Sequence, residues 1–211
     1  MNALKALHHI HRNIEPIGYD YNCRFGACGR CTIMFDGVVR LACWAPLSGQ
    51  HTIEPLKGYP VIKDLVVDTS AVHAQFVRAD TVIKTLEPIV NLKDIDGPHY
   101  WKTLFRLNAC KECMACYSVC TALQVNNRWE SFIGPGALAQ IYFRSVDTTD
   151  KADRVSQAAF SGAFECVQCG NCTKVCTAHI PIMEHIHELT QKAEARGLKP
   201  ANTTASTWPL A

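Results

Sequence analysis

Hydrophobic residues follow a helical period at both ends of the chain. Near the N-terminus, Leu4, Leu7 and Ile10 recur every three residues, which predicts a short helix over residues 3–12. From residue 99 onward strand-like alternation disappears, and the pattern predicts an all-helical second half. The helices expected in this half are 99–109, 113–123, 136–144, 154–165 and 182–195.

Between these helical stretches the pattern is that of β-strands. Residues 31–36 and 38–43 are rich in β-branched and apolar residues and flank an Asp-Gly dipeptide, which is typical of a tight hairpin. Residues 51–54 predict a further strand, and residues 56–70 are interpreted as a connector that leads into a helix. The sequence therefore predicts an α+β chain with two domains.

The twelve cysteines form three runs of four. The first run has the spacing C-x4-C-x2-C-x11-C, whereas the second and third share C-x2-C-x2-C-x3-C and form an internal repeat. The first run is Cys23, Cys28, Cys31 and Cys43, the second is Cys110, Cys113, Cys116 and Cys120, and the third is Cys166, Cys169, Cys172 and Cys176.

Composition narrows the chemistry of these thiols. The formal net charge of +2 does not indicate a nucleic-acid partner. The N-terminus lacks the apolar core of a secretion signal, and no run approaches the ~20 apolar residues of a membrane span. A chain in a reducing compartment is predicted, where thiolates bind metal rather than form disulfides.

The first run predicts a plant-type [2Fe–2S] centre held by all four of its cysteines. Three close thiolates must wrap a flat two-iron cluster, so the loop has to bend sharply. Gly26 and Gly29 permit the positive φ angles and the close backbone approach that this bend requires. Zinc is the alternative, although zinc sites favour pairs of Cys-x2-Cys type.

The second and third runs carry the bacterial ferredoxin signature, in which the fourth cysteine binds the cluster of the other run. One [4Fe–4S] cluster is therefore expected on Cys110, Cys113, Cys116 and Cys176. The other is expected on Cys120, Cys166, Cys169 and Cys172. This exchange would hold the helical domain together, so the domain should be unstable without its iron. The nine histidines are not expected to be ligands, because the cysteines complete the set.

The order of these motifs resembles the iron–sulfur subunit of succinate dehydrogenase and fumarate reductase. CRFGACGRC and the LAC that ends at Cys43 are similar to that family's [2Fe–2S] ligands, and residues 51–68 and 132–150 also resemble it. The resemblance implies a β-grasp domain over 1–70 that lacks its first hairpin, because the chain starts at a helix. A linker (71–98), a helical ferredoxin domain (99–197) and a tail (198–211) would follow.

The resemblance also implies electron transfer between a flavoprotein subunit that carries FAD and a membrane quinone. The substrate chemistry would lie on the flavoprotein. The chain would sit in the cytoplasm, peripheral to the membrane through its partner subunits. The alternatives are the same role beside another flavoprotein dehydrogenase or reductase, a free ferredoxin-like carrier, or a structural zinc protein.

Four positions depart from the family pattern. Most relatives lack the cysteine at position 169 and hold a [3Fe–4S] centre there, so Cys169 predicts a [4Fe–4S] cluster instead. Thr121 and Thr177 stand where relatives have proline. Val125 replaces a tryptophan that contributes to the quinone site. The electron acceptor could therefore be a quinone. It could instead be another redox subunit, either a membrane anchor or a cysteine-rich protein.

Overall fold

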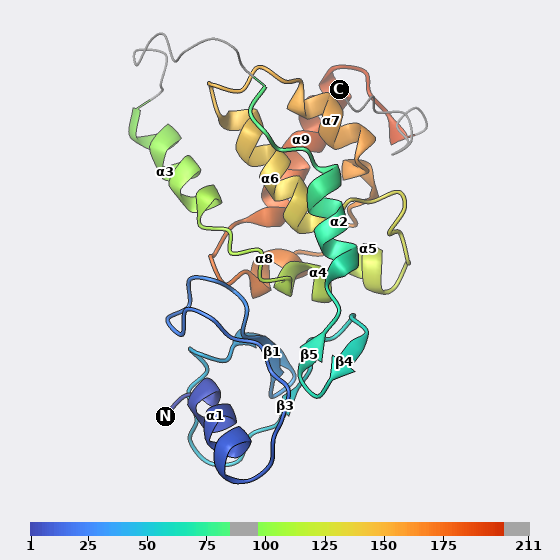
Figure 1. Cartoon of the computed structure of the whole chain (residues 1–211). Helices are drawn as coiled ribbons and strands as arrows, with labels where there is room; N and C mark the ends of the chain where they lie inside the picture. Colours follow the sequence, from blue (N-terminus) through green and yellow to red (C-terminus); the bar gives the residue numbers. More distant parts are fainter. Residues whose placement is uncertain (85–96, 201–211) are drawn as a thin grey trace.

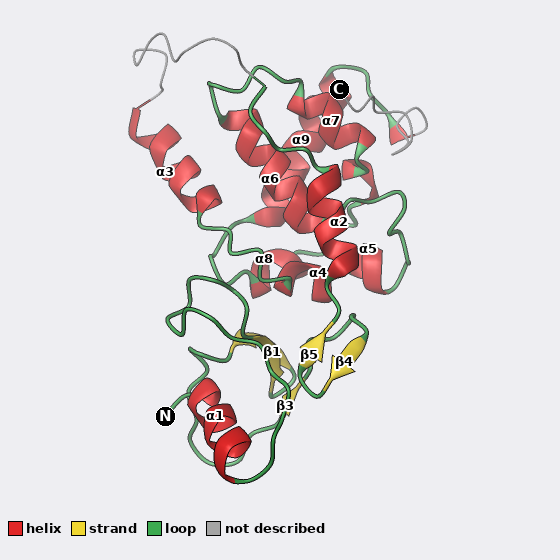
Figure 2. Cartoon of the chain, in the orientation of Figure 1, coloured by secondary structure: helices red, strands yellow, loops and turns green. Residues whose placement is uncertain are grey.

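The strands lie with the N-terminal helix in one part of the molecule, and the other helices form the rest (Figure 1); Figure 2 shows the strands confined to the part next to the N-terminus. A computed structural model describes residues 1–84 and 97–200. The strands are β1 (Thr32–Phe35), β2 (Val38–Leu41), β3 (Ile53–Glu54), β4 (Val61–Lys63) and β5 (Val66–Val67). The helices are α1 (Ala3–Asn13), α2 (Ser70–Arg78), α3 (Gly97–Asn108), α4 (Ala115–Ser118), α5 (Thr121–Gln124), α6 (Pro135–Val146), α7 (Arg154–Phe160), α8 (Asn171–Val175) and α9 (Ile182–Ala195), with a 3₁₀ turn over Ala163–Glu165.

Helix α1 confirms the helix predicted at the N-terminus. The Asn2 side chain caps it by accepting a hydrogen bond of 3.0 Å from the Lys5 amide. Its buried face, which includes Leu4 and Leu7, packs against the residues that follow β2. The amide of Leu4 donates to the Ala42 carbonyl at 3.0 Å, so α1 supports the segment that presents Cys43.

The predicted hairpin is confirmed in a three-stranded antiparallel sheet of order β2-β1-β3. Asp36 and Gly37 join β1 to β2, and both have positive φ angles (50° and 75°), as a type I′ turn requires. The sequence does not predict the second hairpin, β4-β5, within the expected connector. Its strands are short, and the side chains of Val61 and Ile62 are exposed, so they show no buried alternation.

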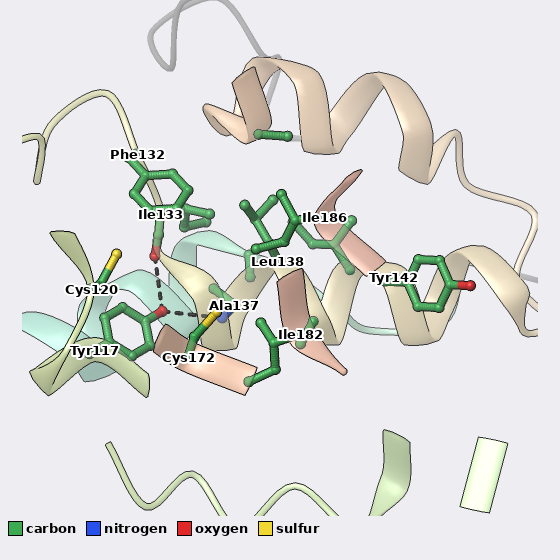
Figure 3. Packing of buried hydrophobic residues seen from close by; sticks show 14 of the residues in the cluster. Tyr117, Cys120, Phe132, Ile133, Ala137, Leu138, Tyr142, Cys172, Ile182 and Ile186 are labelled. Carbon is green, nitrogen blue, oxygen red and sulfur yellow. Dashed lines mark hydrogen bonds between the residues drawn. The ribbon is translucent and has the colours of Figure 1, made fainter. Parts of the chain in front are cut away.

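The C-terminal part is built around α6, which packs against α7 and α9. Gly134 and Pro135 begin α6, as the sequence predicts from the break before this helix. Figure 3 shows the apolar core here, with the Tyr117 hydroxyl donating to the Ile133 carbonyl at 2.9 Å and accepting from the Ala137 amide at 3.1 Å. The buried tyrosine thereby ties the second cysteine run to the start of α6 without leaving a polar atom unpaired.

Two of the expected helices are interrupted. Residues 113–123 form α4 and α5 rather than one helix, because Cys120 between them is extended (φ −73°, ψ 113°). Residues 154–165 form α7 and the 3₁₀ turn, separated by Gly162 at φ 86°. A Cβ at Gly162 would lie 1.9 Å from the Ser131 carbonyl oxygen, so the chain must turn at a glycine there.

A helix starts the segment that the sequence predicts as a linker. The buried Val72 of α2 packs in the C-terminal core, and the Gln75 amide donates to the Trp129 carbonyl at 3.0 Å. Arg154 of α7 donates to the carbonyls of Asp80 and Val82 at 2.8 and 2.6 Å. Residues 70–82 are thus held on the helical part, whereas the rest of the predicted linker (85–96) and most of the predicted tail (201–211) lie outside the described residues.

We expect Arg154→Met to lower the free energy of unfolding by about 3–5 kcal/mol, because it strands a buried carboxylate. Arg154 is 4% exposed and donates twice to Asp150 Oδ2, at 2.9 and 2.7 Å. Arg196→Met is the matched control, since Arg196 pairs with Asp153 where both side chains are 52% exposed, and it should cost less than about 1 kcal/mol. Thermal unfolding of the iron-loaded protein measures the stability of both variants. Equal losses of stability would contradict a structural role for the buried Arg154–Asp150 pair.

Candidate iron–sulfur centres

The first cysteine run forms a loop whose backbone amides point at its own sulfurs. The amides of Ala27 and Cys28 donate to Cys23 Sγ at 3.3 Å, and the Cys23 amide donates to Cys28 Sγ at 3.4 Å. Donation from the Phe25 amide, followed by that of the Cys28 thiol, lowers the pKa of Cys23 to about 6. The loop therefore favours the thiolate form, which is the form that binds iron.

The other two cysteines of this run, Cys31 and Cys43, are buried. Burial, followed by the hydrogen bond with Cys31, raises the pKa of Cys43 to about 11. The four cysteines thus combine a half-buried pair in the loop with a buried pair beside the sheet. A second thiolate in this buried pair is unfavourable unless a cation compensates it, and cluster iron supplies that charge.

Two glycines in this loop behave as the sequence predicts. Gly26 has φ 83°, and a Cβ there would lie 2.2 Å from the Trp44 ring. Gly29 has φ 70°, and a Cβ there would lie 2.6 Å from the Cys113 Cβ. The loop of the first run is therefore in direct backbone contact with the second run.

The second and third runs together line two cavities. The first cavity is surrounded by Cys110, Cys113, Cys116 and Cys176 together with apolar residues such as Phe76 and Ile180. The second cavity is surrounded by Cys120, Cys166, Cys169 and Cys172 together with apolar residues such as Phe132 and Met183. Each cavity contains three cysteines of one run and the closing cysteine of the other, which is the grouping that the ferredoxin spacing predicts. Ligation of a cluster by each group of four stays a prediction.

Backbone geometry accounts for the exchanged cysteines. Cys120 (ψ 113°) and Cys176 (ψ 112°) are both extended residues that follow a short helix. The extended conformation carries each side chain out of its own run and across to the other cavity. Figure 3 shows Cys120 and Cys172, which line the second cavity, among the buried side chains of the core.

Two buried thiols of the second cavity stay protonated unless a cation such as cluster iron compensates the charge of their thiolates. Burial, followed by repulsion from Cys166, raises the pKa of Cys172 to about 12, and burial raises that of Cys120 to about 11. Cys169 is exposed and differs. Partial burial raises its pKa, but the amide of Asn171 and the hydroxyl of Thr121 outweigh this effect and lower it overall.

The donor arrangement does not suit a single metal ion. Within residues 1–84 and 97–200, no three His, Cys, Asp or Glu side chains converge on one point that would hold an ion. Four thiols spread around an apolar cavity instead match a cluster that offers one iron to each thiol. The arrangement of the thiols therefore favours a cluster over a single zinc ion.

Two threonines near the cavities were not predicted as functional from the sequence. Thr121 Oγ1 donates to Cys169 Sγ at 3.5 Å, and Thr177 Oγ1 lies 3.5 Å from Cys113 Sγ. The Lys111 ammonium donates to the Thr177 carbonyl at 2.9 Å and lies 5.6 Å from the centre of the Trp44 ring. The signal in the sequence was their position, since each threonine directly follows the closing cysteine of a run.

The described helices do not include one that is long and apolar enough to cross a membrane. No histidine of the described residues is among those that line either cavity. His8 contacts the Tyr19 hydroxyl at 2.5 Å, and His185 stacks on Tyr142 with 4.1 Å between ring centres. These two histidines take part in packing contacts, and the assignment of cysteines as the ligands stays a prediction.

Two family models match the chain. Residues 1–74 match the 2Fe-2S iron-sulfur cluster binding domain, and residues 106–180 match the 4Fe-4S dicluster domain. These two matches support iron–sulfur cofactors in this chain.

Known iron–sulfur proteins are similar to this chain over most of its length. A fumarate reductase (CoM/CoB) subunit of Methanothermobacter marburgensis is 31% identical over 95% of this chain and 40% of its own length. The chain spans about 40% of the length of this relative and of two other curated relatives, which are iron–sulfur proteins of Methanococcus maripaludis and Methanocaldococcus jannaschii. A chain of the Mycobacterium smegmatis Sdh1 complex in the apo form has the same fold, with a TM-score of 0.80, 24% identity, and coverage of 94% of this chain and 87% of that one.

The fumarate reductase iron–sulfur subunit of Mycobacterium tuberculosis is 31% identical over 93% of this chain and 83% of its own length. With its motif order, two domains and fold, the chain belongs to the family of iron–sulfur subunits of succinate dehydrogenase and fumarate reductase.

Proposed function

We propose that the chain is the electron-transfer subunit of a succinate dehydrogenase or fumarate reductase-type complex. It would pass electrons one at a time between a flavoprotein subunit that carries FAD and a membrane quinone or membrane-associated redox subunit. Substrate chemistry would take place on the flavoprotein. The clusters, when bound, supply one-electron carriers, and the chain's own residues hold and space them.

The observation that carries this proposal is the continuity of the three thiol groups. Gly29 brings the loop of the first run against Cys113 with no room for a side chain. Helices α4 and α8 then pack together and bring the two cavities side by side. Because electron transfer weakens steeply with distance, a row of adjacent centres favours a relay.

The ligand assignment that goes with this role has three parts. A [2Fe–2S] cluster would be held by Cys23, Cys28, Cys31 and Cys43. A first [4Fe–4S] cluster would be held in the first cavity by Cys110, Cys113, Cys116 and Cys176. A second [4Fe–4S] cluster would be held in the second cavity by Cys120, Cys166, Cys169 and Cys172. The lowered pKa of Cys169 supports a thiolate that keeps the fourth iron, in contrast to a [3Fe–4S] centre.

The partner subunits would meet opposite ends of this row. The loop of the first run exposes Phe25 next to Arg24, which suits contact with a flavoprotein. The second cavity opens near the exposed Cys169 and Val167, where the acceptor would approach. Attachment to the cytoplasmic face of the membrane would then depend on the partners.

Co-purification tests the role in the complex. The tagged chain, purified anaerobically, is expected to bring down a subunit that contains FAD, and succinate is expected to reduce its clusters. A stable monomer with all clusters intact on size exclusion would instead support a free ferredoxin-like carrier. A bound flavoprotein that reduces the clusters with another substrate, and not with succinate, would support the alternative dehydrogenase.

Cluster content tests the ligand assignment. The wild-type chain should contain about 10 iron atoms and show no [3Fe–4S] signal in the EPR spectrum of the oxidised sample. Cys169→Ser should lose about one iron and gain that signal, because the thiolate of the fourth corner is gone. Val167→Ser is the matched control, since it changes an exposed neighbour without removing a thiol. A wild-type protein with about 9 iron and the [3Fe–4S] signal would show Cys169 to be a bystander.

The contact at Gly29 gives a second prediction. Gly29→Ala should slow electron passage from the first centre to the first cavity by at least about tenfold, because its Cβ forces the two loops apart. Gly49→Ala is the matched control: Gly49 also has a positive φ (89°), but no atom lies within 4 Å of the added Cβ. Both variants carry a backbone strain of about 1–2 kcal/mol. Freeze-quench EPR after addition of succinate measures the rate, and equal rates in the two variants would refute the relay contact.

A further inference from the structure

The two threonines that follow the closing cysteines occupy equivalent positions around the cavities. Thr121 follows Cys120, and its hydroxyl donates to Cys169 Sγ at 3.5 Å. Thr177 follows Cys176, and its hydroxyl lies 3.5 Å from Cys113 Sγ. In both cases the sulfur belongs to the second cysteine of the opposite run. The same contact thus occurs twice, across sequence separations of 48 and 64 residues.

This symmetry follows from the repeat. The two runs have the same spacing, and each closing cysteine is extended toward the cavity of the other run. The next residue is therefore already beside that cavity. A short side chain with a hydroxyl reaches the nearest sulfur there, whereas a side chain without a donor leaves that sulfur with backbone amides alone.

The direction of the hydrogen bond is fixed once iron is bound. A cysteine ligand is a thiolate and has no proton to donate, so the threonine hydroxyl must be the donor. Hydrogen bonds to cluster sulfurs stabilise the reduced form, which carries one more negative charge, and so raise the reduction potential. The effect belongs to the cluster in the cavity that the threonine faces, and not to the cluster of its own run.

We propose that Thr121 and Thr177 are positioning residues that raise the reduction potentials of the two cubane clusters in a crossed manner. Thr177 would act on the cluster of the first cavity through Cys113, and Thr121 on that of the second cavity through Cys169. The proposal rests on the proposed ligand assignment.

The surroundings of the two contacts predict unequal effects. The Thr177 contact is partly buried, and Lys111 fixes the Thr177 carbonyl with a hydrogen bond of 2.9 Å. The Thr121 contact is exposed, and Val167 occupies the position in the third run that Lys111 occupies in the second. Because hydrogen bonds are stronger where water is excluded, loss of the Thr177 hydroxyl should have the larger effect.

The experiment is an EPR-monitored redox titration of the full chain, purified anaerobically with its accompanying subunits. Thr177→Val should lower the potential of the cluster in the first cavity only, and Thr121→Val that of the cluster in the second cavity only. At a fixed potential near the midpoint, the reduced-to-oxidised ratio should fall by about three- to tenfold, where tenfold equals about 59 mV for one electron. The matching Thr→Ser variants keep the hydroxyl and should titrate like the wild type.

Thr173→Val is a matched control next to the second cavity, where Cys172 and Met183 are lining residues. Its hydroxyl donates to Glu184 at 3.1 Å and accepts from the Met183 amide at 3.0 Å, so no sulfur loses a donor. Both potentials should stay at the wild-type values in this variant.

The possible outcomes separate the proposal from its premise. Unchanged potentials in both Val variants, or a shift of the cluster in the wrong cavity, would overturn the crossed tuning. Thr→Ala removes the same hydroxyl without a branched side chain. Loss of iron from the Val and Ala variants but not from Ser would make the hydroxyl a requirement for assembly and would also overturn the tuning role. Iron content and EPR of the wild type test the ligand assignment independently, because they involve no threonine variant.

Discussion

The exchange of closing cysteines between the second and third runs is the constraint on which the helical part depends. Cys176 lines the cavity of the second run, and Cys120 lines that of the third. Each run must therefore be placed correctly for both cavities to have four thiols. The core around α6 provides that placement, since the Tyr117 hydroxyl joins the second run to the start of this helix. Packing and metal binding are thus coupled: neither cavity is complete unless the whole helical part has folded.

Several features of the fold could be predicted from the sequence because local chemistry determines them. The Asp36-Gly37 turn needs two positive φ angles, and few other dipeptides adopt them without backbone strain. The cysteine spacing predicted which thiols share a cavity, because three ligands of a cubane must lie on one short loop. The helix before the sheet was visible in the spacing of Leu4 and Leu7, both of which are buried.

Other features depend on contacts that are distant in the sequence and could not be predicted. The cavities force extended backbone at Cys120, so a segment with helical periodicity is divided into α4 and α5. Helix α2 depends on burial of Val72 and on the hydrogen bond from Gln75 to Trp129, a residue 54 positions away. Periodicity describes a segment by itself, and neither of these partners is near its segment in the chain.

The contact between the two parts of the molecule has a consequence for thermal motion. At Gly29 the backbone of one loop lies against the Cβ of Cys113, and Lys111 reaches from the same segment toward Trp44. No rotatable side chain separates Gly29 from Cys113. The gap between the loops at this point therefore varies only with movements of the main chain, which are small in packed loops, and not with rotamer exchange on the nanosecond scale. A backbone contact of this kind keeps a narrow distribution of distances between the two loops. Individual molecules therefore differ little from one another in the electron-transfer step proposed across this contact.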